Sequence, residues 1–213
     1  MNSMVDALIV VVLLLNFFLL GTSRLRAVIN ASAAQGVLLG ILMFFMHVDF
    51  GIKAVLIIAA TIILKGVFIP SMLVRAMRDA AIRREIEPII GFLPSLLLGA
   101  LGTGASLLFA KTLPLAPQHE GSLLVPASLA TVFTGFIILT TRRKAISQTV
   151  GYLVLENGIF IMGLTLILAM PFMIEMGVLL DLFVCIFIMG IIINHINREF
   201  SSLDTARLST LKE

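Results

Sequence analysis

Glu156 is the residue at which the sequence first suggests chemistry, because it interrupts an apolar stretch of membrane length. It lies within G-Y-L-V-L-E-N-G-I-F-I-M-G, residues 151–163. A charged side chain at bilayer depth costs on the order of 3 kcal/mol even on mild insertion scales, so retained ones are usually paired, protonated or on an ion path. Two interpretations follow: a carboxylate locked in an ion pair, or a proton relay. We favour the relay, since intramembrane carboxylates tend to mark ion pathways.

Two polar side chains precede Glu156 at intervals of four residues, namely Gln148 and Tyr152. A helix places all three on one stripe of its surface. At 1.5 Å per residue, Glu156 lies about 18 Å beyond Lys144, near the middle of a bilayer. The spacing therefore predicts a hydrogen-bonded ladder along which water from the cytoplasm reaches the carboxylate.

Asp181 is the second candidate for the relay, about 15 Å along the next apolar run from Pro171. Glu175 lies nearer the outer end of that run, as either an interfacial carboxylate or a functional one. His195 lies at the cytoplasmic end, where a histidine more often caps helix carbonyls than relays protons. We interpret His195 as structural and keep it as a secondary candidate with Glu175.

Lys65 is a basic residue within an apolar run, about 22 Å from Gly51. A lysine stem is long enough to snorkel to the inner membrane surface from this position. The alternative is a proton-relay lysine or a counter-charge to a carboxylate, because an ammonium group can titrate. The sequence leaves both interpretations open.

The composition places all of these residues in an integral membrane protein. Of 213 residues, 60% are hydrophobic and 13% are charged, with a mean hydropathy of +1.13; soluble domains carry roughly 25% charged residues. Cys185 is the single cysteine, so neither an internal disulfide nor a cysteine metal site can form. We expect no catalytic, cofactor-binding or metal-binding residue on this chain.

Apolar runs near 20 residues in length predict an all-α fold with seven transmembrane helices. The predicted spans are 4–21, 27–46, 50–73, 89–110, 121–140, 146–169 and 172–195. We divide the chain into a three-helix unit (1–74), a cytoplasmic loop with connecting helix and outer loop (75–120), a second three-helix unit (121–200) and a cytoplasmic tail (201–213).

The basic residues are distributed very unevenly between the two sides of these spans. One side receives Arg24, Arg26, Arg75, Arg78, Arg83, Arg84, Arg142, Arg143, Lys144, Arg198, Arg207 and Lys212, and the other receives Lys53 and Lys111. Twelve against two predicts an outside N-terminus and a cytoplasmic C-terminus. In this predicted topology the segment from 75 to 88 is the main cytoplasmic loop.

Three stretches carry a resemblance to a known family: V-L-E-N-G around Glu156, E-M-G-V-L-L-D-L-F-V around Asp181, and the tail I-N-R-E-F-S-S-L-D-T-A-R-L-S-T-L-K. Together they look like the component E family of hydrogenase-4 and formate hydrogenlyase-type membrane complexes. The last three spans also resemble the K subunit of respiratory complex I and the C subunit of multisubunit cation/proton antiporters. In the K subunit two membrane glutamates occupy successive helices; Glu156 matches the first, and the shorter Asp181 lies where the second would be.

This resemblance implies a non-catalytic proton-translocating or coupling subunit in the cytoplasmic (inner) membrane of a prokaryote. The expected partners are antiporter-like subunits, a membrane-anchor subunit and a hydrogenase or iron-sulfur arm, which would carry the Ni-Fe centre and iron-sulfur clusters. A subunit of a cation/proton antiporter without a redox arm is the alternative, and a pure scaffold would leave the two carboxylates unexplained. No nucleic-acid partner is expected.

Overall fold

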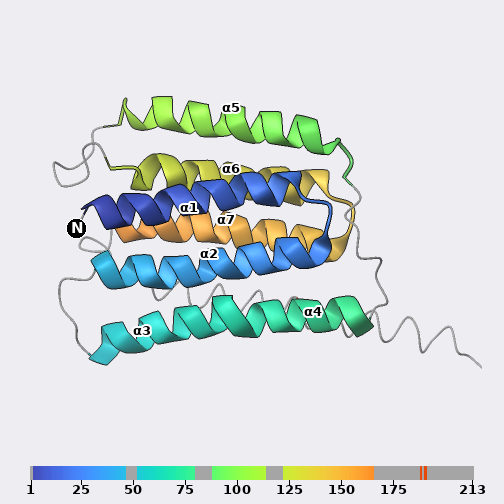
Figure 1. Ribbon diagram of the computed structural model, residues 1–213, viewed down its shortest axis with the longest axis horizontal. Coiled ribbons are helices and arrows are strands. Elements are labelled where there is room, and N and C mark those ends of the chain that lie inside the picture. Colours follow the sequence, from blue (N-terminus) through green and yellow to red (C-terminus); the bar gives the residue numbers. More distant parts are fainter. Residues whose placement is uncertain are drawn as a thin grey trace, which may run out of the picture.

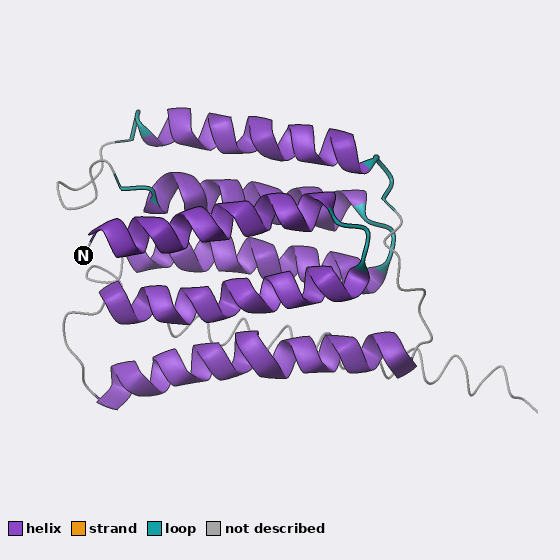
Figure 2. Ribbon diagram, viewed as in Figure 1, coloured by secondary structure: helices purple, strands orange, loops and turns teal. Residues whose placement is uncertain are grey.

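The chain is seen in a computed structural model, which describes residues 2–46, 52–79, 88–113, 122–165, 188 and 190. Every named element in these residues is a helix (Figures 1 and 2). In chain order they are α1 (Asn2–Gly21), α2 (Leu25–Met46), α3 (Ile52–Ile63), the π-helical turn η1 (Leu64–Phe68), α4 (Ile69–Asp79), α5 (Phe92–Ala110), α6 (Leu124–Thr141) and α7 (Ala145–Thr165).

Six segments of these helices are long and apolar enough to cross a membrane, and they match the first six predicted spans. The third crossing is made by α3, η1 and α4 in succession, and it continues to Asp79 rather than ending at residue 73. Ala76 and Met77 are buried in this extension, which explains why the chain stays helical through its two arginines. The seventh predicted span, 172–195, lies outside the described residues except for two positions.

The helices lie side by side, with α5 at one edge of the bundle and α3 and α4 at the other (Figure 1). In α7 14 of the 21 residues are buried, against 4 of the 19 in α5, so α7 is central and α5 peripheral. The contact between α6 and α7 depends on small residues. A Cβ added at Gly158 would lie 2.6 Å from the Val132 backbone nitrogen, so only glycine permits this approach of the two backbones.

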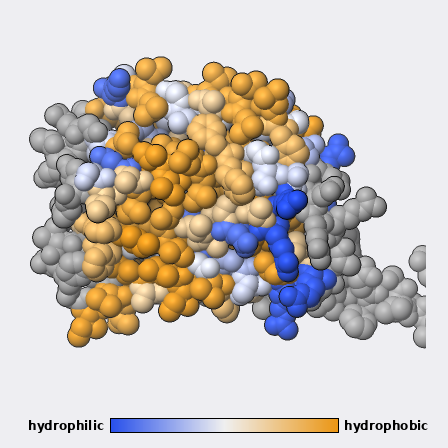
Figure 3. Space-filling model, in the orientation of Figure 1, coloured by the Kyte–Doolittle hydropathy of each residue, from blue (hydrophilic) through white to orange (hydrophobic). Residues whose placement is uncertain are grey.

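The outer surface of the bundle is apolar where a membrane would contact it. Leu14, Leu101 and Leu108 are each more than half exposed. Figure 3 shows that hydrophobic residues cover most of the visible described surface, while hydrophilic ones gather near the end at which α4 terminates. Such a surface suits acyl chains, and together with the six apolar helices it supports a multi-pass membrane protein.

Arg142, which the sequence analysis counted among the basic residues of the cytoplasmic side, is buried at the end of α6, with 1% of its surface exposed. Its guanidinium donates to the Leu20 carbonyl (3.0 Å) and to Ser95 Oγ (3.4 Å), and it lies 5.3 Å from the centre of the Phe92 ring. Burial lowers its pKa, yet a guanidinium remains charged at physiological pH. Arg142 therefore joins the ends of α1, α5 and α6; we call this side of the bundle the Arg142 end.

Two hydrophobic clusters fill the interior, one toward each end of the helices. The cluster at the Arg142 end includes Leu19, Ile29, Leu73, Ile138 and Val150. The second cluster, toward the opposite end, includes Ile9, Leu39, Ile58, Leu124 and Ile161. On each contributing helix a polar residue lies in sequence between the members of the two clusters, and these polar residues form the candidate site.

Candidate functional site

Six buried polar residues form a layer between the two hydrophobic clusters, which we call the central polar layer. Its members are Asn16 on α1, Gln35 on α2, Lys65 on η1, Thr131 on α6, and Glu156 and Asn157 on α7. None of them is more than 6% exposed. Buried polar groups at this depth must satisfy one another, because lipid offers no hydrogen bonds.

Lys65 and Glu156 form a salt bridge at the centre of this layer. Lys65 Nζ lies 2.8 Å from Glu156 Oε1, and the two side chains are only 5% and 3% exposed. The ammonium also donates to Asn157 Oδ1 at 3.3 Å and lies 5.4 Å from the centre of the Phe160 ring. The Lys65 side chain therefore points inward as a counter-charge, rather than snorkelling to the membrane surface.

The local backbone that carries Lys65 is a π turn, and Pro70 supplies a physical reason for it. Proline has no N–H and its ring collides with the carbonyl four residues earlier, here that of Gly66. The helix widens just before this point, and the Ile69 N–H bonds to the Leu64 carbonyl, five residues back. Such π turns occur frequently at functional sites, because they change the direction in which a side chain projects.

Asn157 links the salt bridge to α2. Its Oδ1 accepts from the Lys65 ammonium, while its Nδ2 donates to Gln35 Oε1 at 3.4 Å. The amide of Asn157 is thus held between a charged donor and a neutral acceptor, which fixes the orientation of its two ends.

The same chain of hydrogen bonds continues from Gln35 across α1 to α6. Gln35 Nε2 donates to Asn16 Oδ1 at 2.7 Å and to the Val12 carbonyl at 3.4 Å. Asn16 Nδ2 then donates to Thr131 Oγ1 at 2.9 Å, and the Thr131 hydroxyl donates to the Ala127 carbonyl at 2.7 Å. Side chains from five helical elements are therefore joined through the centre of the bundle.

Of the predicted ladder, only Glu156 belongs to the central polar layer. Gln148 Nε2 donates to the Arg142 carbonyl at 3.0 Å, and so contributes to the turn between α6 and α7. Tyr152 is partly buried against the hydrophobic cluster at the Arg142 end. The periodicity correctly placed these residues along α7, but Gln148 has a nearer partner in the turn.

The remaining predicted site residues, Asp181, Glu175 and His195, lie outside the described residues, so their roles stay predictions. Within the described part of the chain, no three His, Cys, Asp or Glu side chains gather as metal ligands would.

Sequence reasoning missed Asn16, Gln35, Thr131 and Asn157 as members of the site. Each is a polar residue in an apolar run, and in a membrane helix that is itself a signal for interhelical hydrogen bonding. A single amide, however, does not reveal its partner, since 115 positions separate Asn16 from Thr131.

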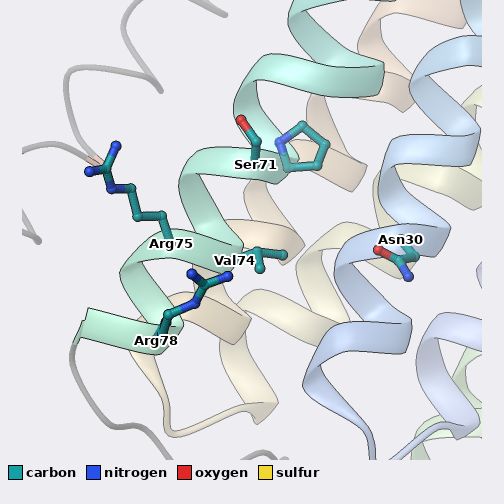
Figure 4. Close-up of a pocket in the computed structure, with 6 residues that line it drawn as sticks. Asn30, Ser71, Val74, Arg75 and Arg78 are labelled. Carbon is teal, nitrogen blue, oxygen red and sulfur yellow. The ribbon is translucent and has the colours of Figure 1, made fainter.

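A separate pocket of about 630 Å³ opens between α2 and α4, lined by Asn30, Pro70, Ser71, Val74, Arg75 and Arg78. Figure 4 shows both arginines on α4, with Asn30 across from them on α2. They are two of the charges behind the orientation prediction, and here they lie on the last turns of a helix rather than in a loop. The salt bridge does not line this pocket.

No protein-family model and no solved structure matches the chain. A curated relative does: the chain is 30% identical over 193 residues to the uncharacterized protein Rv0085 of Mycobacterium tuberculosis. The match spans 89% of this chain and 87% of the relative, so it covers most of the sequence rather than a single motif. The chain belongs to the same family as the uncharacterized protein Rv0085.

Proposed function

We propose that this chain is a non-catalytic subunit of a complex I-related, energy-converting hydrogenase of the hydrogenase-4 or formate hydrogenlyase type, and that it carries protons through Lys65 and Glu156. The observation that carries the proposal is their salt bridge of 2.8 Å inside a bundle of membrane-length helices. The proposal includes seven spans, an outside N-terminus and the cytoplasmic membrane of a prokaryote. The family resemblance and the charge distribution support these finer statements.

The salt bridge has the chemistry that a proton relay needs. At 2.8 Å the Lys65 ammonium can hand its proton directly to the Glu156 carboxylate, leaving a neutral amine and a neutral acid. Desolvation makes a buried ion pair expensive, which brings the neutral and the ionised forms closer in energy than they are in water. A charge that moves in a neighbouring subunit can then shift the proton between the two groups.

The experiment is a measurement of proton pumping by the assembled complex in membrane vesicles with a proton-sensitive dye. Glu156→Gln keeps the size and hydrogen bonding of the side chain but cannot release a proton. We expect pumping to fall sharply while assembly survives, and Glu156→Asp to keep part of it. Asp6→Asn, which neutralises a carboxylate at the start of α1 outside the central polar layer, is the matched control.

Full pumping by an assembled Glu156→Gln complex would leave the salt bridge as a structural feature. Asp181→Asn extends the same experiment to the second predicted carboxylate. A milder loss is expected if Asp181 only adjusts the electric field around the relay, and a comparable loss if it is an obligatory stop for the proton.

The proposed partners are tested by purification of the native complex. A hydrogenase large subunit and iron-sulfur subunits should copurify with the chain, and their genes should lie beside its own. Antiporter subunits without any redox subunit would instead indicate a cation/proton antiporter.

A further inference from the structure

We propose that Thr131 is a positioning residue for the salt bridge, and that it acts at a distance through three amide side chains. The Thr131 hydroxyl anchors the far end of the chain and, together with the Val12 carbonyl at Gln35, fixes the direction in which its amides point. That direction determines whether Lys65 meets a hydrogen-bond acceptor or a donor. It therefore determines whether the proton of the salt bridge lies on Lys65 or on Glu156.

The two ends of the chain impose the same direction. The Lys65 ammonium can only donate, so the Asn157 amide must turn its oxygen toward it. At the other end the Thr131 hydroxyl has already given its proton to the Ala127 carbonyl, so its oxygen accepts. Asn16 must therefore present its NH₂ group to Thr131.

The middle of the chain fits both ends. Gln35 gives its NH₂ group to Asn16 Oδ1 and also to the Val12 carbonyl, and its oxygen accepts from Asn157. Turning over any one amide would oppose oxygen to oxygen or NH₂ to NH₂ in a buried place. All links thus run from donor to acceptor in a single direction, from the ammonium to the backbone carbonyl of Ala127.

The chemical consequence falls on Lys65. An acceptor oxygen beside the amine favours its protonated form, whereas an NH₂ group in the same place would favour the neutral amine, whose lone pair can accept. The observed direction therefore holds the proton on Lys65 and leaves Glu156 ionised. Without the Thr131 oxygen this preference weakens, and the proton moves toward Glu156.

The inference deepens the proposed function, because it concerns the same salt bridge, but it rests only on the hydrogen bonds of the described residues. Its test uses the isolated full-length chain in lipid nanodiscs and requires no transport. A failure here is therefore distinguishable from a failure of the proton-pumping experiment.

The measurement is the infrared carbonyl band of protonated Glu156, followed across the physiological pH range. For each variant, the spectrum of the same variant carrying Glu156→Gln is subtracted as a reference. The bands of the other carboxyl groups then cancel. In Thr131→Val, the valine has nearly the shape of threonine but lacks the oxygen that accepts the hydrogen bond from Asn16. We expect it to raise the ratio of protonated to ionised Glu156 severalfold, less than the roughly tenfold effect of one unsatisfied buried donor, because the Val12 carbonyl still orients Gln35.

Two matched variants separate this effect from packing. Thr131→Ser keeps the hydroxyl and should restore the wild-type ratio. Thr134→Val removes an equally buried hydroxyl one turn along α6. That hydroxyl donates to the Ala130 carbonyl and lies outside the central polar layer. It should also leave the ratio unchanged.

An unchanged band in Thr131→Val, or an equal change in Thr134→Val, would overturn the proposal. If Thr131→Val cannot be isolated as a folded protein, Asn16→Ala decides, because it removes the next link of the chain and should raise the protonated fraction in the same direction. An unaltered band in folded Asn16→Ala protein would equally overturn the proposal.

Discussion

Gly36 on α2 lies directly against Lys65: a Cβ added to Gly36 would come within 2.5 Å of the lysine Cβ and 3.2 Å of its carbonyl oxygen. The helix that presents the buried ammonium is thus positioned by the absence of a side chain on its neighbour. This contact, together with the π turn, sets how far Lys65 reaches toward Glu156.

Gly36→Ala should therefore push η1 away from α2 and weaken the salt bridge. Overpacking of this kind costs about 1–3 kcal/mol of stability. Thermal unfolding in detergent measures the loss. Gly104→Ala is the matched control, since a Cβ on this α5 glycine meets nothing within 4 Å. Equal melting temperatures for the two variants would contradict the contact.

Replacing the two partners of the salt bridge singly and together separates its structural from its functional role. Lys65→Met or Glu156→Met alone leaves one buried group uncompensated, and each should cost about 3 kcal/mol. The double variant should recover most of that loss, because two apolar side chains need no partner. Denaturant unfolding of the wild type, the two single variants and the double variant measures these free energies. Additive losses would mean that the two residues do not interact in the folded protein.

Arg142 and its neighbour Arg143 should differ strongly in their contributions to stability. Arg142→Ala leaves the Leu20 carbonyl and Ser95 without their donor, and such losses cost about 1–3 kcal/mol. Arg143 is exposed, and Arg143→Ala should change stability by less than about 0.5 kcal/mol. Thermal unfolding of both variants in nanodiscs makes the comparison. A larger effect at Arg143 would contradict the stabilising role of the Arg142 hydrogen bonds.

The orientation of the chain is predicted by the distribution of its basic residues. A reporter enzyme that is active only in the cytoplasm should work when fused after Glu213 and fail when inserted in the loop at 114–126. Seven spans require opposite results at these two places. Activity at both places would mean that an even number of spans lies between them.

The C-terminal tail lies outside the described residues, and its role stays a prediction from the sequence. Leu203, Leu208 and Leu211 form a short apolar series among charged residues, which suits docking on a partner. Deleting 201–213 should reduce copurification of neighbouring subunits without preventing membrane insertion. A complex of unchanged composition after this deletion would count against docking.

The sequence alone predicted the membrane class and the position of six helices, because a bilayer requires long apolar segments and a local average of hydropathy detects them. It also singled out Glu156 and Lys65, since a charge in an apolar run is conspicuous without any knowledge of its surroundings.

The pairing of these residues was decided by the tertiary structure. Lys65 and Glu156 are 91 positions apart, and either could have met a lipid headgroup, water or another helix. Arg142 shows the same limit, since the sequence assigned it only to one side of the membrane, whereas the packing of α1 and α5 buried it. Periodicity reports which face of a helix a residue occupies; which helix lies against that face depends on the close approach of backbones at Gly36 and Gly158, and on hydrogen bonds that exist only once the helices are assembled.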